Sequence, residues 1–99
     1  MPDFEWDPEK EARNIEKHGL DFATASQIWG GSVTEKADER YDYGETRTIA
    51  TGVADEGVLV VVYTRRAETR RIISARKANS REKRLFEEEI ARRGGASPD

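Results

Sequence analysis

Residues 58–77, VLVVVYTRRAETRRIISARK, decide the fold of this 99-residue chain. The first part, Val58 to Arg65, is β-branched and apolar almost throughout, which is typical of a central strand covered on both faces. The polar tripeptide at 67–69 predicts a turn, and residues 70–77 predict the next strand. The stretch therefore predicts two consecutive strands of an antiparallel meander.

The second of these strands carries several basic side chains. In a regular strand, successive side chains point to opposite faces of the sheet. On that basis Arg70, Ser74 and Arg76 share one face, and Ile73 and Ala75 share the other. We therefore expect a basic surface on one side of the sheet and apolar contacts on the other.

Two helices are predicted upstream of the meander. The short aromatic segment Phe4-Glu5-Trp6 predicts a strand, and Asp7-Pro8 is typical of a helix start. His18-Gly19 is typical of a helix end, because glycine readily adopts the left-handed conformation that closes a helix. Asp21 then predicts the cap of a second helix, which Gly30-Gly31 stops.

The remaining segments complete an α+β order with two N-terminal helices, an antiparallel β-sheet meander and a C-terminal helix, and we expect the helices to pack on one face of the sheet. They are a weak strand, a polar loop, a second strand and a turn, at 33–36, 37–44, 47–53 and 55–57. Asn79 or Ser80 begins the closing helix, and a cap at Asn79 places Glu82 where a capping box needs it. We expect a single domain over residues 1–93 and a flexible tail over 94–99.

Charge is distributed unevenly along the chain. The net charge is −3, yet residues 1–64 carry −8 and residues 65–99 carry +5. Between Arg65 and Arg84, nine basic residues face only two acidic ones, Glu68 and Glu82. Such asymmetry points to a polyanionic partner on one part of the surface.

Composition excludes several classes of site. The chain has no cysteine and one histidine, so it cannot form a disulfide, a thiolate zinc site or an all-histidine metal site. The longest apolar run, Val58 to Tyr63, is far shorter than the roughly 20 residues of a membrane helix. We see no signal peptide pattern. The sequence therefore predicts a cytoplasmic protein without a cofactor.

Several blocks of sequence together resemble the BrnT family of type II toxins, in the RelE-like superfamily. The blocks are Phe4-Glu5-Trp6-Asp7-Pro8, Lys10, Asn14, Lys17-His18-Gly19, Phe22, Ala25, Gly44-Glu45-Thr46-Arg47, residues 59–65 (LVVVYTR), residues 71–76 (RIISAR), Ala78 and Glu82. They run in order from residue 4 to about residue 86. The resemblance implies a RelE-like fold, a ribonuclease activity that slows growth, and neutralisation by a cognate antitoxin.

Metal-independent RNA cleavage needs a base for the 2′-hydroxyl, cations for the transition state and an acid for the leaving 5′-oxygen. Arginine suits the second task because its planar donors match phosphate oxygens. Arg65 and Arg76 are the candidates that the resemblance favours. The alternative is a solvated basic edge that discourages sheet pairing.

Two residues are candidates for proton transfer. His18 carries the only imidazole, and imidazole has an ordinary pKa near about 6.5. The alternative for His18 is a structural role at the C-terminus of its helix. Glu45 is a candidate base, although a glutamate after a glycine is also typical of a solvated turn.

Four more residues are candidates for RNA binding. They are Lys17, Tyr63, Arg70 and Lys77. Tyr63 shares strand parity with Arg65, so it can stack on a base or, alternatively, pack in the core. Trp6 and Trp29 have the same two alternatives.

The partners follow from the resemblance. We expect a BrnA-like antitoxin that binds DNA, an RNA substrate, a toxin–antitoxin hetero-oligomer and no membrane. The chain has no DNA-reading motif, so we expect contact with operator DNA only through the antitoxin, and repression of the operon by the complex. The alternative function is a non-catalytic module that binds RNA or protein, because fold alone does not fix activity.

Overall fold

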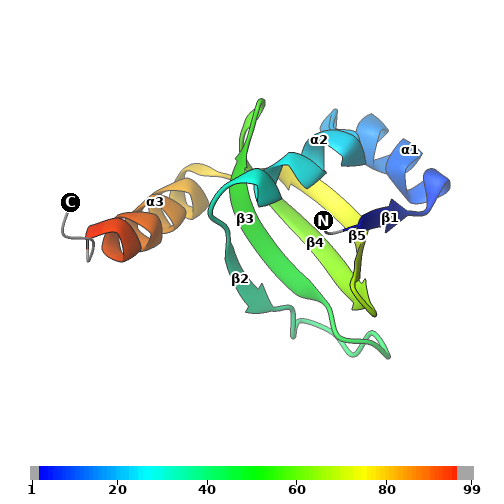
Figure 1. Cartoon of the computed structure of the whole chain (residues 1–99). Coiled ribbons are helices and arrows are strands. Elements are labelled where there is room, and N and C mark those ends of the chain that lie inside the picture. Colours follow the sequence, from blue (N-terminus) through cyan, green and yellow to red (C-terminus); the bar gives the residue numbers. More distant parts are fainter. Residues whose placement is uncertain (1–2, 96–99) are drawn as a thin grey trace.

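The structure, a computed structural model, describes residues 3–95 and consists of a five-stranded sheet with helices around it (Figure 1). The elements are β1 (Asp3–Trp6), α1 (Pro8–His18), α2 (Phe22–Ser26), the 3-10 helix η1 (Gln27–Gly30), β2 (Thr34–Ala37), β3 (Thr48–Ala54), β4 (Gly57–Arg66), β5 (Thr69–Lys77) and α3 (Ser80–Gly95). The sheet order is β1-β5-β4-β3-β2. This confirms the α+β class.

The sheet is mixed rather than wholly antiparallel. Strands β2 to β5 form the expected antiparallel meander, whereas β1 pairs with β5 in parallel. The prediction of an antiparallel sheet is therefore wrong for its first strand. Between β1 and β2 the chain passes through α1, α2 and η1 to the far edge of the sheet, and the meander then returns to place β5 beside β1. Parallel neighbours need a long connection of this kind.

Local sequence signals set the helix ends. The Asp7 carboxylate accepts a hydrogen bond of 2.8 Å from the Glu9 amide, and Gly19 closes α1 in the left-handed conformation, with φ of 72°. The Asp21 carboxylate accepts from the Thr24 amide at 2.7 Å. These contacts confirm the predicted caps of both N-terminal helices.

A β-bulge in β5 separates side chains that the sequence placed together. Val62 lies opposite Ser74, and the next residue, Tyr63, lies opposite Ile72, so Ile73 is an extra residue in β5. Because the alternation of side chains shifts there, Ser74 points to one face of the sheet and Ile72 to the other.

The bulge corrects the predicted faces of β5. Arg70 and Ile72 lie on the face that carries α1 and α2, as does Ala75, whereas Ser74 and Arg76 lie on the opposite face. The prediction that Arg70 and Arg76 share a face is wrong, because it assumed a regular strand.

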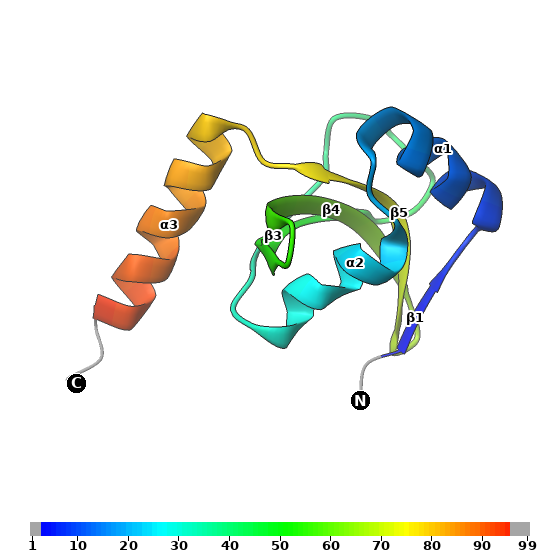
Figure 2. The ribbon, with the colours of Figure 1, turned by 90° about the horizontal axis from the view of Figure 1, so that it is seen from above.

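One face of the sheet is closed by α1, α2 and η1 and holds the main core. The core contains Leu20, Phe22, Ala25, Ile28, Ala50, Leu59, Val61, Tyr63, Ile72 and Ala75. Strands β3 to β5 curve around α2 (Figure 2). Packing is close at Gly52, where an added Cβ would lie 2.8 Å from Ile28 Cβ and 2.9 Å from Val33 Cγ1. We call this side the covered face.

Helix α3 does not pack on the covered face. Figure 2 shows α1 and α2 together, with α3 standing apart from them. The expectation that the helices share one face is therefore wrong for α3. The predicted capping box is confirmed: the Glu82 amide donates to Asn79 Oδ1 at 2.8 Å, and the Asn79 amide donates to Glu82 Oε1 at 2.9 Å.

The end of α3 lies further along the chain than expected. The helix includes Gly94 and Gly95, which the sequence analysis assigned to a tail. Residues 96–99 of that tail lie outside the described residues, and the tail stays a prediction.

Candidate active site

A hollow of about 920 Å³ lies between α3 and the face of the sheet opposite the covered face. We call this side the hollow face. Its floor is formed by aliphatic side chains of the central strands, and Phe86 of α3 is buried beside it. The basic residues that line the hollow are Lys17, His18, Lys36, Arg40, Arg76 and Arg93. Two glutamates also reach it from α3, Glu82 and Glu89. The hollow therefore combines an apolar floor with a cationic wall.

A buried asparagine fixes α1 to β5 at the edge of the hollow. The Asn14 side chain amide donates to the carbonyl oxygens of Leu20 and Ala75, both at 2.9 Å, and its Oδ1 accepts from the Ala75 amide at 3.0 Å. His18 lies one helical turn after Asn14, and Arg76 directly follows Ala75. The Asn14 clamp therefore brings His18 and Arg76, 58 positions apart in the sequence, to one hollow.

Arg76 forms a bidentate ion pair with Glu82. Its two terminal nitrogens each lie 2.7 Å from a Glu82 oxygen, and one of them is 3.4 Å from the Lys77 carbonyl oxygen. Hydrogen bonds from Arg76 lower the pKa of Glu82 to about 2, although partial burial opposes this shift. Because Glu82 also caps α3, one carboxylate both anchors the helix and orients the guanidinium towards the hollow.

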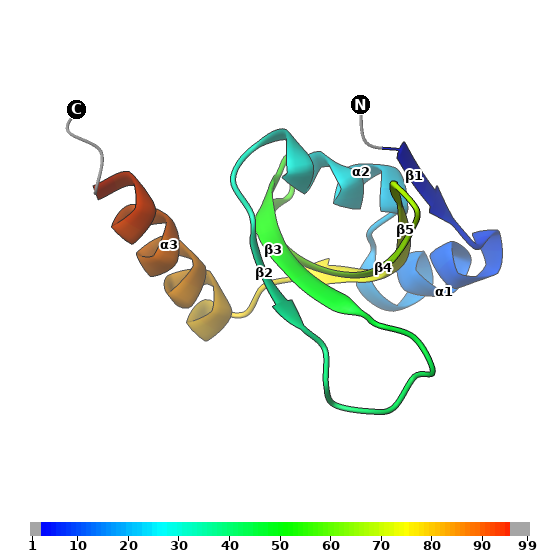
Figure 3. The same ribbon diagram turned by 60° about the horizontal axis from the view of Figure 1, so that its bottom comes forward.

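The loop between β2 and β3 adds a further cation. This loop extends away from the helices (Figure 3). The buried Asp38 carboxylate accepts from Arg40 at 2.8 and 2.9 Å and from the Tyr43 hydroxyl at 3.1 Å, and these bonds, mainly those from Arg40, hold the Asp38 pKa well below its ordinary value. The Asp38 amide donates to the Arg47 carbonyl oxygen at 2.8 Å, which closes the loop. Arg40 is thereby fixed at the rim of the hollow.

The structure brings together three of the predicted site residues. Lys17, His18 and Arg76 line the hollow. Lys77 instead points towards Glu56, with the two charged groups 4.0 Å apart, and is exposed.

Two further predicted residues line a different depression. Arg65 and Glu45 border a shallow groove of about 420 Å³, together with Thr46, Thr48, Thr64 and Arg66. Glu45 pairs with Arg47 at 3.3 Å. The Glu45 carboxylate and the Arg65 guanidinium therefore do not line the hollow that holds His18 and Arg76.

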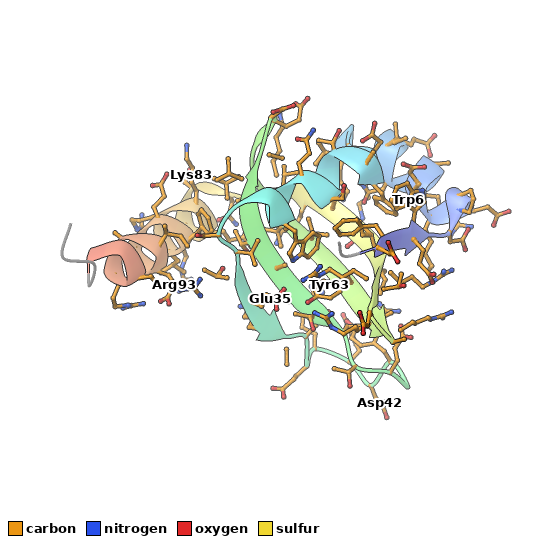
Figure 4. The ribbon with its side chains drawn as sticks, viewed as in Figure 1. Trp6, Glu35, Asp42, Tyr63, Lys83 and Arg93 are labelled. Atoms are coloured by element: carbon orange, nitrogen blue, oxygen red, sulfur yellow. The ribbon has the colours of Figure 1, made fainter. Side chains whose placement is uncertain are left out.

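The last two predicted residues, Tyr63 and Arg70, lie on the covered face. Tyr63 is 2% exposed and belongs to the core, and its hydroxyl donates to Glu35 at 2.8 Å (Figure 4). The Trp29 ring meets Tyr63 edge-on, with centroids 5.2 Å apart, and Trp6 packs in the same manner on Phe22. Both tryptophans therefore pack against the core, which was one of the two alternatives for them.

Sequence reasoning missed four residues that shape the hollow. They are Asn14, Lys36, Arg40 and, as the partner of Arg76, Glu82. The alternation of β2 carried a signal for Lys36, because every second side chain of an edge strand faces the same way. Asn14 and Glu82 were among the residues of the family resemblance, but no role was assigned to them in the hollow. Arg40 gave no signal, since it lies in an irregular loop.

Residues 3–95 contain neither a membrane-spanning helix nor a cluster of metal ligands. None of the helices in this part of the chain has the length and apolar character needed to cross a membrane. In the same residues, no group of three or more histidine, cysteine, aspartate or glutamate side chains is placed to hold a metal ion.

Comparison with known proteins places the chain in a functional context. The family model described as "Ribonuclease toxin, BrnT, of type II toxin-antitoxin system" matches residues 6–82. Among solved structures, the crystal structure of the Brucella abortus ribonuclease toxin BrnT matches with a TM-score of 0.59 and 25% sequence identity, covering 81% of this chain and 100% of that chain. No curated protein matches.

Proposed function

The chain belongs to the BrnT family of ribonuclease toxins of type II toxin–antitoxin systems, and from this premise we propose that it cleaves mRNA in the hollow between the sheet and α3. The observation that carries the proposal is the convergence of His18, Lys17 and Arg76 there. An imidazole, an ammonium and a fixed guanidinium are the groups that phosphodiester cleavage by a 2′-hydroxyl uses. We further propose that the arrangement is RelE-like, as the resemblance implies.

The proposed reaction needs no metal ion. His18 accepts the proton of the 2′-hydroxyl, and the 2′-oxygen forms a bond to the adjacent phosphorus. The bond from phosphorus to the 5′-oxygen breaks, and the Lys17 ammonium supplies a proton to that oxygen. The products are a 2′,3′-cyclic phosphate and a 5′-hydroxyl, so atoms and charge balance.

Arg76 stabilises the charge that builds on the phosphate oxygens in this scheme. Its orientation is set before RNA arrives, because Glu82 holds both terminal nitrogens. The remaining N–H groups are available to the phosphate, and no reorganisation is needed at the moment of reaction. Lys36 and Arg40 add positive potential at the rim.

Arg65 and Glu45 are not part of the proposed reacting set. They line the separate groove, and Arg65 lies on the face of the sheet opposite Arg76. A single phosphate cannot contact both arginines. This choice differs from the full set of catalytic candidates from the sequence, which were Arg65, Arg76, His18 and Glu45.

Cleavage of RNA by the purified chain in EDTA tests the proposal. We expect products with 2′,3′-cyclic phosphate ends, and we expect His18→Ala to lower the rate by about 100-fold or more, as loss of a general acid or base does. Arg84→Ala, an exposed α3 residue outside the hollow, serves as the control. Activity that EDTA abolishes, or that survives His18→Ala unchanged, would contradict this mechanism. RNA binding with no cleavage, also in a translating extract, would favour the binding-module alternative.

We also propose a cytoplasmic setting and a cognate, BrnA-like antitoxin that neutralises the toxin as a hetero-oligomer and represses their operon through its own DNA-binding segment. The family description, which names a type II system, supports an antitoxin partner. A gel shift with operator DNA tests whether the antitoxin alone supplies the DNA contacts: the complex should bind specifically and the toxin alone should not. Specific binding by the toxin alone would refute it.

A further inference from the structure

Arg70 sits in an aromatic enclosure on the covered face, away from the proposed active site. Its guanidinium carbon lies 4.8 Å from the centre of the Trp29 ring, 5.7 Å from that of Tyr63 and 6.0 Å from that of Phe4. Its Nε atom is buried and has no hydrogen-bond partner among residues 3–95. Nor does any ion pair within those residues involve Arg70. Burial of the Nε–H group without an acceptor costs free energy. Because Arg70 is partly exposed, its guanidinium remains within reach of an external anion.

A second arginine stands directly beside Arg70. Arg65 is the cross-strand partner of Arg70 in the β4–β5 pairing, so both side chains share the covered face. The Arg65 guanidinium lies 6.0 Å from the Tyr63 ring centre. Like charges directly opposite each other on a sheet repel. The pair therefore forms a local concentration of positive charge.

The Glu35 carboxylate also lies on this face and is bound by two of the aromatic side chains around Arg70. Glu35 accepts hydrogen bonds from the Tyr63 hydroxyl at 2.8 Å and from Trp29 Nε1 at 3.4 Å. Figure 4 shows Glu35 and Tyr63 side by side on the covered face. In the described part of the chain, neither arginine has an acidic partner within ion-pair distance.

We propose that Arg65 and Arg70 form a second phosphate-binding site, which holds the backbone of an RNA strand outside the catalytic hollow. The guanidinium pair supplies fixed donors that match phosphate oxygens. RNA as the source of the phosphate rests on the proposed ribonuclease function.

The groove next to the pair favours nucleic acid over a protein partner. Arg65 also borders the shallow groove, whose other walls are three threonines, Arg66 and Glu45. Among residues 3–95, no apolar side chain lines this groove, whereas protein docking surfaces bury an apolar centre. Hydroxyl and guanidinium groups suit sugar and phosphate contacts. The rings around Arg70 act as walls for the cation rather than as stacking platforms, so we expect no base preference here.

The position of the site predicts how it affects catalysis. Arg65 and Arg70 lie at the end of the hairpin far from Arg76 and on the opposite face of the sheet. Only a strand longer than a few nucleotides can reach both places. The site should therefore raise the affinity for long RNA and leave the chemical step unchanged.

Binding of 2′-O-methyl RNA tests this without any need for cleavage. We measure the anisotropy of a labelled 12-nucleotide strand and of a dinucleotide, with Arg70→Gln, Arg65→Gln and, as the matched loss of charge, Arg84→Gln. Arg70→Gln and Arg65→Gln should each weaken binding of the long strand by about tenfold and lower the salt slope by about one. Dinucleotide binding should stay the same, and Arg84→Gln should change affinity by less than about twofold.

Several results would overturn the inference. Equal affinity of the Arg70, Arg65 and Arg84 variants for the long strand would remove the site, and so would an equal loss with the dinucleotide. If the Arg70 and Arg65 variants lose antitoxin binding instead, with RNA binding intact, the two arginines bind an acidic group of the antitoxin and not an RNA phosphate. Arg65 is exposed, so its variant reports on the site even if the Arg70 variant is unstable. Failure of cleavage by the wild type would contradict the proposed function but not this site.

Discussion

Arg70 and Arg76 come from one strand, β5, and have opposite surroundings. Arg76 lies on the hollow face and is neutralised by Glu82 through two hydrogen bonds of 2.7 Å. Arg70 lies on the covered face, between aromatic rings and without an acidic partner in residues 3–95. A single extra residue, Ile73, separates them onto the two faces.

The difference teaches that the chain uses its basic residues in two ways. A guanidinium held by its own carboxylate is oriented in advance, which suits a catalytic group. A guanidinium held only by rings keeps its donors free, which suits capture of an anion. Changes that act on one face should therefore leave the other face largely intact.

The largest effect on stability is expected where the two faces are joined, at Asn14. Asn14→Ala removes three buried hydrogen bonds and leaves the Ala75 amide and carbonyl without partners, so we expect a loss of about 3 kcal/mol in the free energy of unfolding. Asn79→Ala, the matched change at a helix cap, should cost about 1 kcal/mol. Urea denaturation measures both. Equal losses would show that Asn14 does not clamp α1 to β5.

A smaller effect is expected from crowding of the covered face. Gly52→Ala places a methyl group within 3 Å of Ile28 and Val33, so we expect about 2 kcal/mol of destabilisation from overpacking. Its neighbour Thr51 points into the hollow, and Thr51→Ser should change stability by less than about 1 kcal/mol. Thermal denaturation of the two variants compares the faces. A Gly52 variant as stable as the wild type would mean that the covered face is not tightly packed.

The smallest effect is expected from the Arg76–Glu82 pair, and it depends on pH. The pKa of Glu82 falls from an ordinary 4.5 to about 2 because Arg76 donates to its charged form. A lowered carboxyl pKa contributes stability that is present above pH 4.5 and is lost as the pH falls towards 2. Since the pair is partly solvent-exposed, we expect about 1 kcal/mol.

Glu82→Gln serves as the comparison for that pH dependence. Glutamine keeps an oxygen acceptor for the Asn79 amide but has no charge for Arg76. The difference in unfolding free energy between wild type and Glu82→Gln, measured at several pH values, should shrink as the pH falls from 5 to 2. A difference that does not vary with pH would show that the ion pair contributes nothing to the folded state.

The sequence was most informative where signals are local. The predicted helix caps are confirmed, because a cap and its partner lie within a few residues of each other. They are Asp7, Gly19, Asp21 and the pair Asn79 and Glu82. The four strands of the meander were also located correctly, because turns and polar segments separate them and because residues 58–65 form a continuous β-branched run.

Prediction failed where one residue alters a pattern or where partners are distant. The extra Ile73 places Arg70 on the face opposite Arg76, and nothing in the sequence of β5 marks a bulge. The bonds of Asn14 to Ala75 span 61 positions, so no spacing rule finds them. The sequence also named Arg65 and Arg76 together as candidates for the transition state, whereas they lie on opposite faces of the sheet.

The most direct test of the account is the single-turnover cleavage rate at saturating RNA for Arg76→Ala and Arg65→Ala. The two arginines lie on one hairpin, and only Arg76 lines the hollow. We predict that Arg76→Ala slows cleavage by 100- to 1,000-fold, roughly as loss of an oriented transition-state donor does, and that Arg65→Ala stays within about threefold of the wild type. A large loss for Arg65→Ala with normal cleavage by Arg76→Ala would place the reaction on the covered face and contradict the account.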